Sequence, residues 1–465
     1  MVGAGPNGLA AAIELARAGR SVVVYEAAAT AGGGTRSGEL TEPGFLHDVC
    51  SAIHPLLLAS PFFSGLSLER LGLEVVQPDA PLAHPVDGGR AVVVERSVEA
   101  TAAALGRDEK AYLRTFGPLV ERAAELVPEL LGPLRPPRHP FVLARFGLPA
   151  LRSATGFARS RFETPEARGL FGGVAAHSML PLGASPTAGV GLLLMILAHH
   201  VGWPLVKGGS QRIADALVDE LRSLGGDVIT NHEVRDIADL PGVAAYLFDV
   251  TPRQLVDIAG ERLPARYRSR LGRYRYGPGV FKIDWALSEP VPWRAPGCRR
   301  AATVHLGWSL EELAASESAA NSGEHSSKPF TLVVQQSLFD PTRAPEGKHT
   351  LWAYCHVPSG SARDMTSVIE AQIERFAPGF RDTVLARQTC NAQEMAAYNA
   401  NYVGGDINGG LQDLRQHFTR PVARVSPYTT PAKDIFLCSS STPPGGGVHG
   451  MCGVFAARAA LKRAF

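Results

Sequence analysis

Three glycines near the start of the chain have the spacing of a phosphate-binding turn. Gly3, Gly5 and Gly8 form a GxGxxG motif, with Pro6 and Asn7 between the last two glycines. Glycine at these positions lets the backbone turn sharply and approach a pyrophosphate closely. The helix that follows would point its free N–H groups and the positive end of its dipole at that anion. These residues therefore predict a binding site for a dinucleotide.

An acidic residue follows the turn at the distance expected for a ribose contact. Glu26 ends the apolar run 22–25 and lies about twenty residues beyond the turn, where a carboxylate accepts hydrogen bonds from ribose hydroxyls. GxGxxG alone is a weak signal. Here strand, turn, helix, strand and acid occur in the order of a Rossmann fold, which favours that fold over a simple glycine-rich turn.

A second glycine-rich loop favours FAD over NAD as the dinucleotide. Gly33, Gly34 and Arg36 lie just beyond Glu26, and NAD-binding domains have no routine use for such a loop. The guanidinium of Arg36 could reach the cofactor's phosphates. A solvated arginine on a surface turn is the alternative interpretation.

Two distant segments complete the predicted cofactor site. Residues 203–237 contain an apolar segment, an amphipathic helix and two short strands, and we expect Val234 and the later Thr251 to contact the cofactor. Residues 434–453 have the pattern of a strand, a glycine loop and the start of a helix whose N-terminus would point at the ligand. The cofactor-binding candidates in this loop are Gly446, Gly447, Val448, His449 and Met451.

With these motifs the chain resembles the phytoene dehydrogenase-like FAD-dependent oxidoreductases of the flavin amine oxidase superfamily. It looks closest to the subgroup related to pyridine nucleotide-disulphide oxidoreductase domain-containing proteins. The resemblance covers essentially the whole length and includes the segments 176–178, 276–287, 340–347 and 374–380. It implies FAD and an α/β fold, in which a Rossmann-type, glutathione reductase-like FAD-binding domain carries an α+β substrate domain built on an antiparallel sheet. Because residues 402–406 contain no cysteine for a covalent link, we expect the FAD to be non-covalent. The C-terminal glycine loop would lie beside the isoalloxazine ring.

The domains that we expect are discontinuous, because all cofactor segments must meet on one ligand. The FAD-binding domain would combine residues 1–75, 205–255 and 425–465. Residues 76–204 would form a mainly helical part of the substrate domain, and residues 256–424 would add its sheet and further helices.

Lys282 and His449 are the catalytic candidates. Lys282 is a charged residue within an apolar strand, and a buried cation is costly unless it is paired or used. In the similar amine oxidases a lysine on such a strand holds a water against flavin N5; the alternative is a lysine on the solvent face. His449 would either add polarity beside the flavin or satisfy a backbone carbonyl. The other histidines in apolar segments have no metal-ligand spacing and are expected to be core residues: His54, His177, His199, His200 and His356.

The composition is that of a large enzyme. The 465-residue chain is 45% hydrophobic and 19% charged, with a formal charge of +2, which suits two or three domains with sizeable cores. Nucleic acid is not an expected partner, because the arginines are scattered and the small cluster at 135–139 reads as a solvated proline-rich loop. The six cysteines contain no CxxC pair, which favours reduced thiols in a cytoplasmic protein.

The most apolar run of the chain is 190–198, about half the length of a membrane span. We expect it to form a buried helix that lines the active-site cavity. The alternative is an exposed face in peripheral contact with a membrane surface.

The first predicted strand is short. Only Met1 and Val2 precede Gly3, whereas a central strand usually contributes about five residues. Each missing buried aliphatic residue would cost about 1.5 to 3 kcal/mol. We therefore expect weak flavin retention in a protein that begins at Met1.

The leading hypothesis for function is dehydrogenation, desaturation or isomerisation of a hydrophobic, for example polyisoprenoid or carotenoid-like, small molecule by hydride transfer to flavin N5. A flavin amine oxidase and a redox-silent flavin-binding scaffold or interaction protein are the alternatives. Oxygen, a quinone or another carrier would accept the electrons, and the sequence leaves the acceptor and the oligomeric state open.

Overall fold

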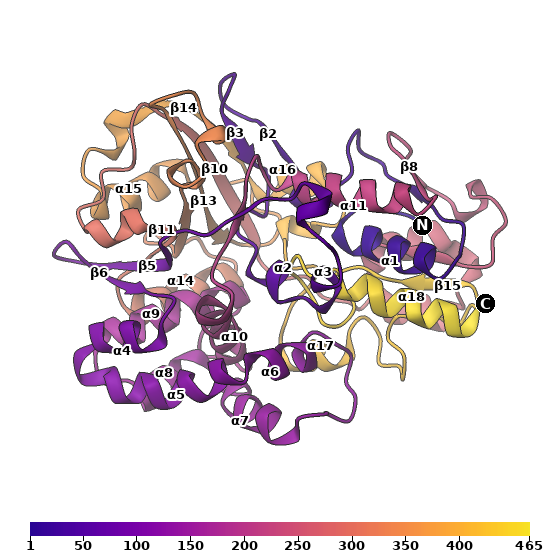
Figure 1. Ribbon diagram of the computed structural model, residues 1–465, viewed down its shortest axis with the longest axis horizontal. Coiled ribbons are helices and arrows are strands. Elements are labelled where there is room, and N and C mark those ends of the chain that lie inside the picture. Colours follow the sequence, from indigo (N-terminus) through magenta and orange to yellow (C-terminus); the bar gives the residue numbers. More distant parts are fainter.

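The computed structural model describes residues 1–465. The chain forms two lobes (Figure 1). One lobe holds both termini and the elements predicted to bind a nucleotide, and the other holds a large sheet with helices on both sides. Segments far apart in the sequence meet in each lobe.

The first lobe is built on a parallel sheet to which three distant segments contribute. Strand β1 pairs with β8, and β9 pairs with β15, all in parallel. Helices α1, α11 and α18 pack on this sheet (Figure 1). The bounds are β1 Val23–Tyr25, β8 Asp227–Ile229, β9 Tyr246–Phe248, β15 Ile435–Leu437, α1 Pro6–Arg17, α11 Gln211–Ser223 and α18 Met451–Arg463. This is the Rossmann-type arrangement that the sequence predicts.

Val2 joins the two strand pairs into one sheet. It bridges Tyr25 on one side and Phe248 on the other, both in parallel. The Val2 N–H donates to the Leu247 carbonyl at 3.0 Å, and the Val2 carbonyl accepts from the Asp249 N–H at 2.8 Å. The shortened first strand is therefore fully paired within the sheet.

The second lobe contains a seven-stranded sheet in the order β14-β10-β13-β12-β11-β5-β6. All neighbours are antiparallel except β5 and β11, which are parallel. The sheet is therefore mixed, whereas the sequence predicted an antiparallel one. The parallel pair joins β5 to β11, two strands that are distant in the sequence and not connected by a hairpin, so no turn forces them to be antiparallel. The bounds are β5 Ala80–Val86, β6 Arg90–Val94, β10 Gly279–Leu287, β11 Ala301–Leu306, β12 Thr331–Val334, β13 His349–Val357 and β14 Val384–Cys390.

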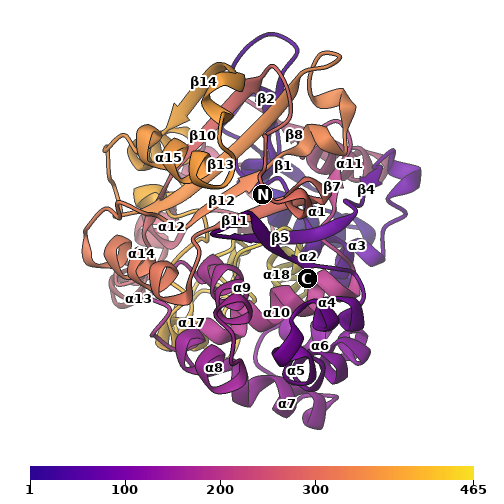
Figure 2. The ribbon, with the colours of Figure 1, turned by 90° about the vertical axis from the view of Figure 1, so that its left-hand side faces the viewer.

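Helices cover both faces of this sheet (Figure 2). On one face lies α15 (Thr366–Phe376), whose Ile369 and Ile373 belong to the same buried hydrophobic cluster as Phe281 and Ile283 of β10. On the other face lies a helical layer formed by residues 98–200. Its helices are α4 Val98–Ala104, α5 Glu109–Glu121, α6 Ala123–Leu130, α7 Pro140–Ala150, α8 Ala154–Arg161, α9 Pro165–Ala175 and α10 Thr187–His200.

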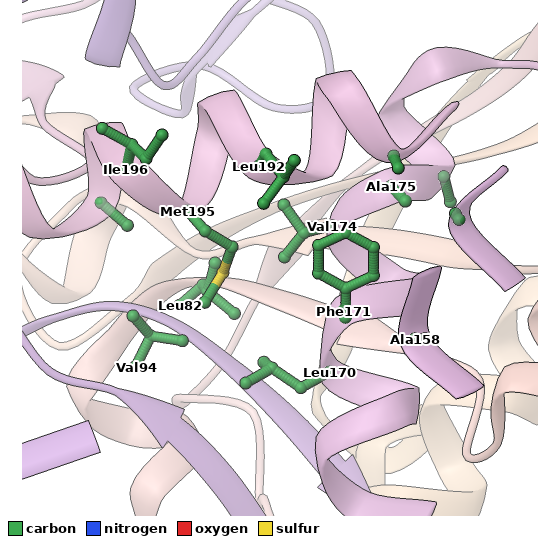
Figure 3. Close-up of a cluster of buried hydrophobic side chains, with 14 of the residues drawn as sticks. Leu82, Val94, Ala158, Leu170, Phe171, Val174, Ala175, Leu192, Met195 and Ile196 are labelled. Carbon is green, nitrogen blue, oxygen red and sulfur yellow. The ribbon is translucent and has the colours of Figure 1, made fainter. Parts of the chain in front are cut away.

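Helix α10 is the centre of the helical layer. Its residues Leu192, Met195 and Ile196 pack with Phe171 of α9 and Leu82 of β5 (Figure 3). The apolar run 190–198 is thus buried as the sequence predicted, and the alternative of a membrane-contacting face on this run is wrong. None of the helices is both long and apolar enough to span a bilayer.

Short elements connect the lobes and complete their surfaces. The strand pairs β2 with β3 and β4 with β7 are antiparallel. The bounds are β2 Ser37–Glu39, β3 Leu46–Asp48, β4 Val75–Val76, β7 Leu205–Val206, α2 Pro55–Ala59, α3 Pro61–Ser64, α12 Pro252–Ala259, α13 Ala265–Leu271, α14 Leu310–Ser322, α16 Ala392–Tyr398 and α17 Leu414–Thr419.

Candidate active site

A cavity of about 320 Å³ runs from the glycine turn of the first lobe to the large sheet of the second. At one end it is lined by Gly5, Pro6 and Asn7. At the other end, with His177 and Thr303 as polar neighbours, its lining is mainly aromatic and aliphatic: Leu194, Trp203, Leu332, Val334, Trp352 and Tyr354. The cavity thus has a backbone-rich end and an apolar end.

The glycine turn is as tight as the motif predicts. Gly3 has φ +93°, and a Cβ on Gly8 would lie 2.1 Å from the Gly3 carbonyl oxygen. Gly5 caps α1 without any side-chain hydrogen bond, and Pro6 is its first residue. Only glycine fits at position 8, and the N-terminus of α1, whose N-cap residue has no side chain, leaves backbone N–H groups that suit an anionic ligand.

Asp249, which the sequence analysis did not select, closes the turn from the end of β9. Its Oδ2 accepts a hydrogen bond from the Gly8 N–H at 2.8 Å, and it lies against Gly3 and Gly5 as well. Burial raises the pKa of Asp249 to about 7, and the nearby Glu26 adds to that shift. The signal was present in the sequence, because Asp249 follows a buried strand just as Glu26 does.

Glu26 and Arg36 form a buried ion pair beside the turn. Glu26 Oε2 accepts from the Ala4 N–H at 2.8 Å, and Glu26 Oε1 accepts from Arg36 Nη2 at 3.0 Å. Arg36 also donates to the Thr30 carbonyl. Both side chains are 10% exposed, so the alternative of a solvated Arg36 is wrong.

The second glycine loop packs directly against the turn. A Cβ on Gly33 would lie 3.2 Å from Gly5 Cα, and one on Gly34 would lie 2.5 Å from the Tyr402 hydroxyl. Both glycines line the cavity, as does Thr251. Val234 does not line it and packs instead in a buried cluster with Val2 and Phe248.

The C-terminal loop reaches the cavity through Gly447 and Val448. Gly446 and Met451 lie behind this lining, and Met451 begins α18. Next to this loop, Asn7 Nδ2 donates to Ser440 Oγ at 3.3 Å, which ties the first and last cofactor segments together.

His449 is used inside its own loop. The Met451 N–H donates to Nδ1 at 3.0 Å, so the proton of the neutral ring is on Nε2, which donates to the Gly445 carbonyl at 3.1 Å. Burial lowers the pKa of His449 to about 4. The ring is absent from the cavity lining, so the interpretation of His449 as a residue that satisfies the backbone agrees with its contacts.

Lys282 is buried, which contradicts the alternative of a solvent-facing lysine. It is 2% exposed, its Nζ donates to Asp284 Oδ2, and it lies 5.8 Å from the centre of the Trp352 ring. Trp352 lines the cavity and Lys282 does not. Burial raises the pKa of Asp284 to about 6. Pairing with Asp284 is what stabilises the buried lysine.

Two of the remaining histidines line the cavity. His54 Nε2 lies 2.8 Å from Ser210 Oγ, and His177 Nε2 lies 3.0 Å from His305 Nε2. Burial lowers the pKa of His54 to about 4 and that of His177 to about 3. Outside the cavity lining, His199 contacts Tyr112, His356 contacts Glu317, and His200 is exposed.

The residues present fit a flavin dinucleotide. Three glycines leave room where any Cβ would clash, a helix N-terminus faces the same space, and a buried glutamate lies beside it. Cys50 is the one cysteine that lines the cavity, and burial raises the pKa of its thiol. A protonated thiol is a poor nucleophile, which agrees with non-covalent cofactor binding.

Comparison with known proteins supports the nucleotide-binding assignment. The family model described as an NAD(P)-binding Rossmann-like domain matches residues 1–60. The chain is 26% identical over 316 residues to pyridine nucleotide-disulfide oxidoreductase domain-containing protein 2 of Rattus norvegicus, and the match covers 57% of this chain and 54% of the relative. The chain thus spans about half the length of that relative.

Two further proteins match over nearly the whole chain. One of the subunits of limonene dehydrogenase from Castellaniella defragrans is 27% identical over 505 residues, which cover 96% of this chain and 91% of that protein. The structure of wild-type putrescine oxidase bound to putrescine is similar with a TM-score of 0.64 at 19% identity, over 99% of this chain and 97% of that one. Residues 1–60 therefore match an NAD(P)-binding Rossmann-like domain, and the chain as a whole has a fold similar to that of putrescine oxidase.

Proposed function

We propose that this protein is a phytoene dehydrogenase-like, FAD-dependent oxidoreductase that dehydrogenates, desaturates or isomerises a hydrophobic small molecule, such as a polyisoprenoid or carotenoid-like compound. The observation that carries this proposal is the single cavity that joins the glycine turn to an apolar chamber. Bound FAD would supply the hydride acceptor at its N5. The chain itself would hold FAD without a covalent bond and orient the substrate.

The apolar chamber supports an uncharged substrate. Trp203, Leu332 and Tyr354 would bury the substrate's apolar surface, which is favourable by about 25 cal/mol per Å². Among Asp, Glu, Lys and Arg, only Asp249 lines the cavity, and it lies at the glycine turn. A charged substrate would lose its hydration without gaining an ionic partner.

A flavin amine oxidase is the second candidate. Trp352 and Tyr354 pack edge to face, with ring centres 5.2 Å apart at an interplanar angle of 87°, and present an aromatic wall to the cavity on which a neutral amine could lie. The likeness to putrescine oxidase in fold favours this candidate. The lack of a carboxylate in the chamber argues against a diammonium substrate such as putrescine.

Anaerobic reduction of the flavin tests these candidates. Protein loaded with FAD is mixed with limonene or with putrescine, and the loss of visible flavin absorbance is followed. We expect bleaching by the apolar molecule only. Bleaching by putrescine alone would replace the proposal with an amine oxidase, and a flavin that resists even dithionite would identify a redox-silent scaffold.

A variant of the chamber separates substrate binding from flavin redox chemistry. Leu332→Asn places an amide in the apolar lining. We expect it to slow bleaching by the hydrophobic substrate and to leave dithionite reduction unchanged. Oxygen, a quinone and a protein carrier can then be compared as acceptors by the rate at which each restores the absorbance.

A further inference from the structure

Helix α7 exposes large apolar side chains on its outer side. Phe141 is 89% exposed and Leu148 is 75% exposed, and their spacing of seven residues places both on one face of the helix. Leu134 before the helix is 75% exposed, and Leu151 after it is 46% exposed. Figures 1 and 2 both show α7 at the lower edge of the molecule, on the side of the helical layer that faces away from the large sheet. We call Leu134, Phe141, Leu148 and Leu151, together with Arg138 and Arg145, the α7 surface.

The charged residues that the segment around α7 itself contributes are all basic. Residues 130–162 contain six arginines and no Asp or Glu. Arg145 lies between Phe141 and Leu148 on the same helix face, and neither Arg138 nor Arg145 forms an ion pair with its side chain. The acids that reach this segment come from outside it, in the pairs Arg135–Glu129, His139–Glu125 and Arg159–Glu311.

The exposed apolar surface continues onto the end of helix α17 and the loop that follows it. A small depression is lined by Leu134 on one side and by Phe418 and Val425 on the other. Phe418 is 46% exposed and Val425 is 108% exposed. Arg424 beside them is also exposed. Two segments that are distant in the sequence thus present the same combination of apolar and cationic side chains.

We propose that the α7 surface docks on a membrane that contains anionic lipid. Exposed Phe and Leu side chains interleaved with arginine are the chemistry of interfacial helices, whose apolar side chains enter the acyl boundary while guanidinium groups contact phosphate headgroups. The segment itself holds no acid over 33 residues, and the carboxylates that reach it from outside are paired with Arg135, His139 and Arg159. The side chains of Arg138 and Arg145 form no ion pair and are available to contact an anionic headgroup.

The α7 surface lies one helix away from the apolar chamber. Helix α7 packs on α10, and Leu194 of α10 lines the cavity. Docking would hold the chamber near the bilayer, where apolar molecules dissolve. The docking proposal stands on the surface residues alone and does not depend on the proposed redox activity.

Vesicle sedimentation tests the proposal. The purified full chain is mixed with vesicles of phosphatidylcholine and with vesicles of phosphatidylcholine and phosphatidylglycerol. We expect binding to the anionic vesicles and weaker binding at high salt. Phe141→Ser with Leu148→Ser should weaken binding by about tenfold or more, because each apolar side chain loses its burial in lipid. Each of Arg138→Gln and Arg145→Gln should weaken it about fivefold.

Matched control variants keep the test specific. Val243 and Leu385 are 50% and 53% exposed elsewhere on the molecule, and Val243→Ser with Leu385→Ser should bind vesicles like the unchanged protein. Wild-type protein that stays in solution with anionic vesicles at low salt would overturn the proposal. So would a dimer in light scattering that Phe141→Ser with Leu148→Ser converts to a monomer without any vesicle binding, because the α7 surface would then be an interface between two copies of the chain.

Discussion

Asp249→Asn should stabilise the cofactor-free protein at alkaline pH. Asp249 is 8% exposed, and its only hydrogen bond through a side-chain oxygen is the one from the Gly8 N–H. An asparagine keeps a carbonyl oxygen for that N–H and removes the buried charge. Burial raises the pKa of Asp249 to about 7, so the charged form is the one that the folded state disfavours.

The magnitude follows from the pKa difference. The folded state binds the Asp249 proton more tightly than the unfolded chain does, where the pKa is about 3.8. The stability linked to this group is therefore fully present below about pH 3.8, decreases as the pH rises to about 7, and stays lost above it. A shift of about three units corresponds to about 4 kcal/mol. Asp249→Asn should recover up to that amount at pH values above about 7 and almost nothing near pH 4.

Urea unfolding of the FAD-free protein at a series of pH values measures this difference. Asp239→Asn, a change at an exposed aspartate of the same lobe, is the control and should alter stability little at any pH. FAD titration of the same variants should show tighter binding to Asp249→Asn at alkaline pH, because no carboxylate then lies beside the pyrophosphate. A stability gain that is independent of pH, or a loss at alkaline pH, would refute the reasoning about Asp249.

Substitutions at Gly8 and Lys282 and a fall in pH also have defined outcomes. Gly8→Ala should abolish FAD binding and destabilise the fold by about 3 kcal/mol or more, because its Cβ would meet a carbonyl oxygen at 2.1 Å. Gly117→Ala is the matched control, because Gly117 faces open space on α5. It should raise the melting temperature slightly, since alanine favours the helix more than glycine does. Equal FAD affinities of Gly8→Ala and Gly117→Ala would count against the predicted turn. Lys282→Met should cost about 3 to 5 kcal/mol, because the buried Asp284 then keeps only His47, at 3.5 Å, as a potential ionic partner, and adding Asp284→Leu should restore most of it in urea unfolding. The free energy of unfolding should also decrease as the pH falls from about 6.5 towards 4, because buried neutral histidines gain protons on unfolding. A free energy of unfolding that stays constant over this pH range would contradict this. Burial lowers the pKa to about 3 or 4 for His47, His54, His84, His177, His199 and His449.

The cofactor half of the fold could be predicted because its signals are local. Steric demands on Gly3 and Gly8 act over a few residues, and the same demands appear in the structure as a positive φ and a close backbone approach. The amphipathic pattern before 225 likewise predicts the helix α11. Local patterns of this kind need no knowledge of which segments meet.

The apolar end of the cavity could not be predicted, because it depends on strand register. Trp352 and Tyr354 alternate with Ala353 along β13, and the alternation alone does not say which set faces the cavity. The pairing of Tyr354 with Lys282 puts the lysine on the same sheet face as the aromatic rings, but one strand farther from the chamber. Sequence reasoning correctly found an unusual lysine and could not find Asp284 as its partner.

The titratable groups in the cavity explain why the proposed chemistry depends on a cofactor. A general base for hydride-transfer chemistry should have a pKa near the working pH. His177 and His54 line the cavity with pKa values lowered to about 3 and about 4, so both are neutral but very weak bases. Asp249 has a pKa of about 7 but lies at the glycine turn. The apolar end therefore offers a substrate shape and dryness rather than proton transfer, and a bound redox cofactor is what would make that environment reactive.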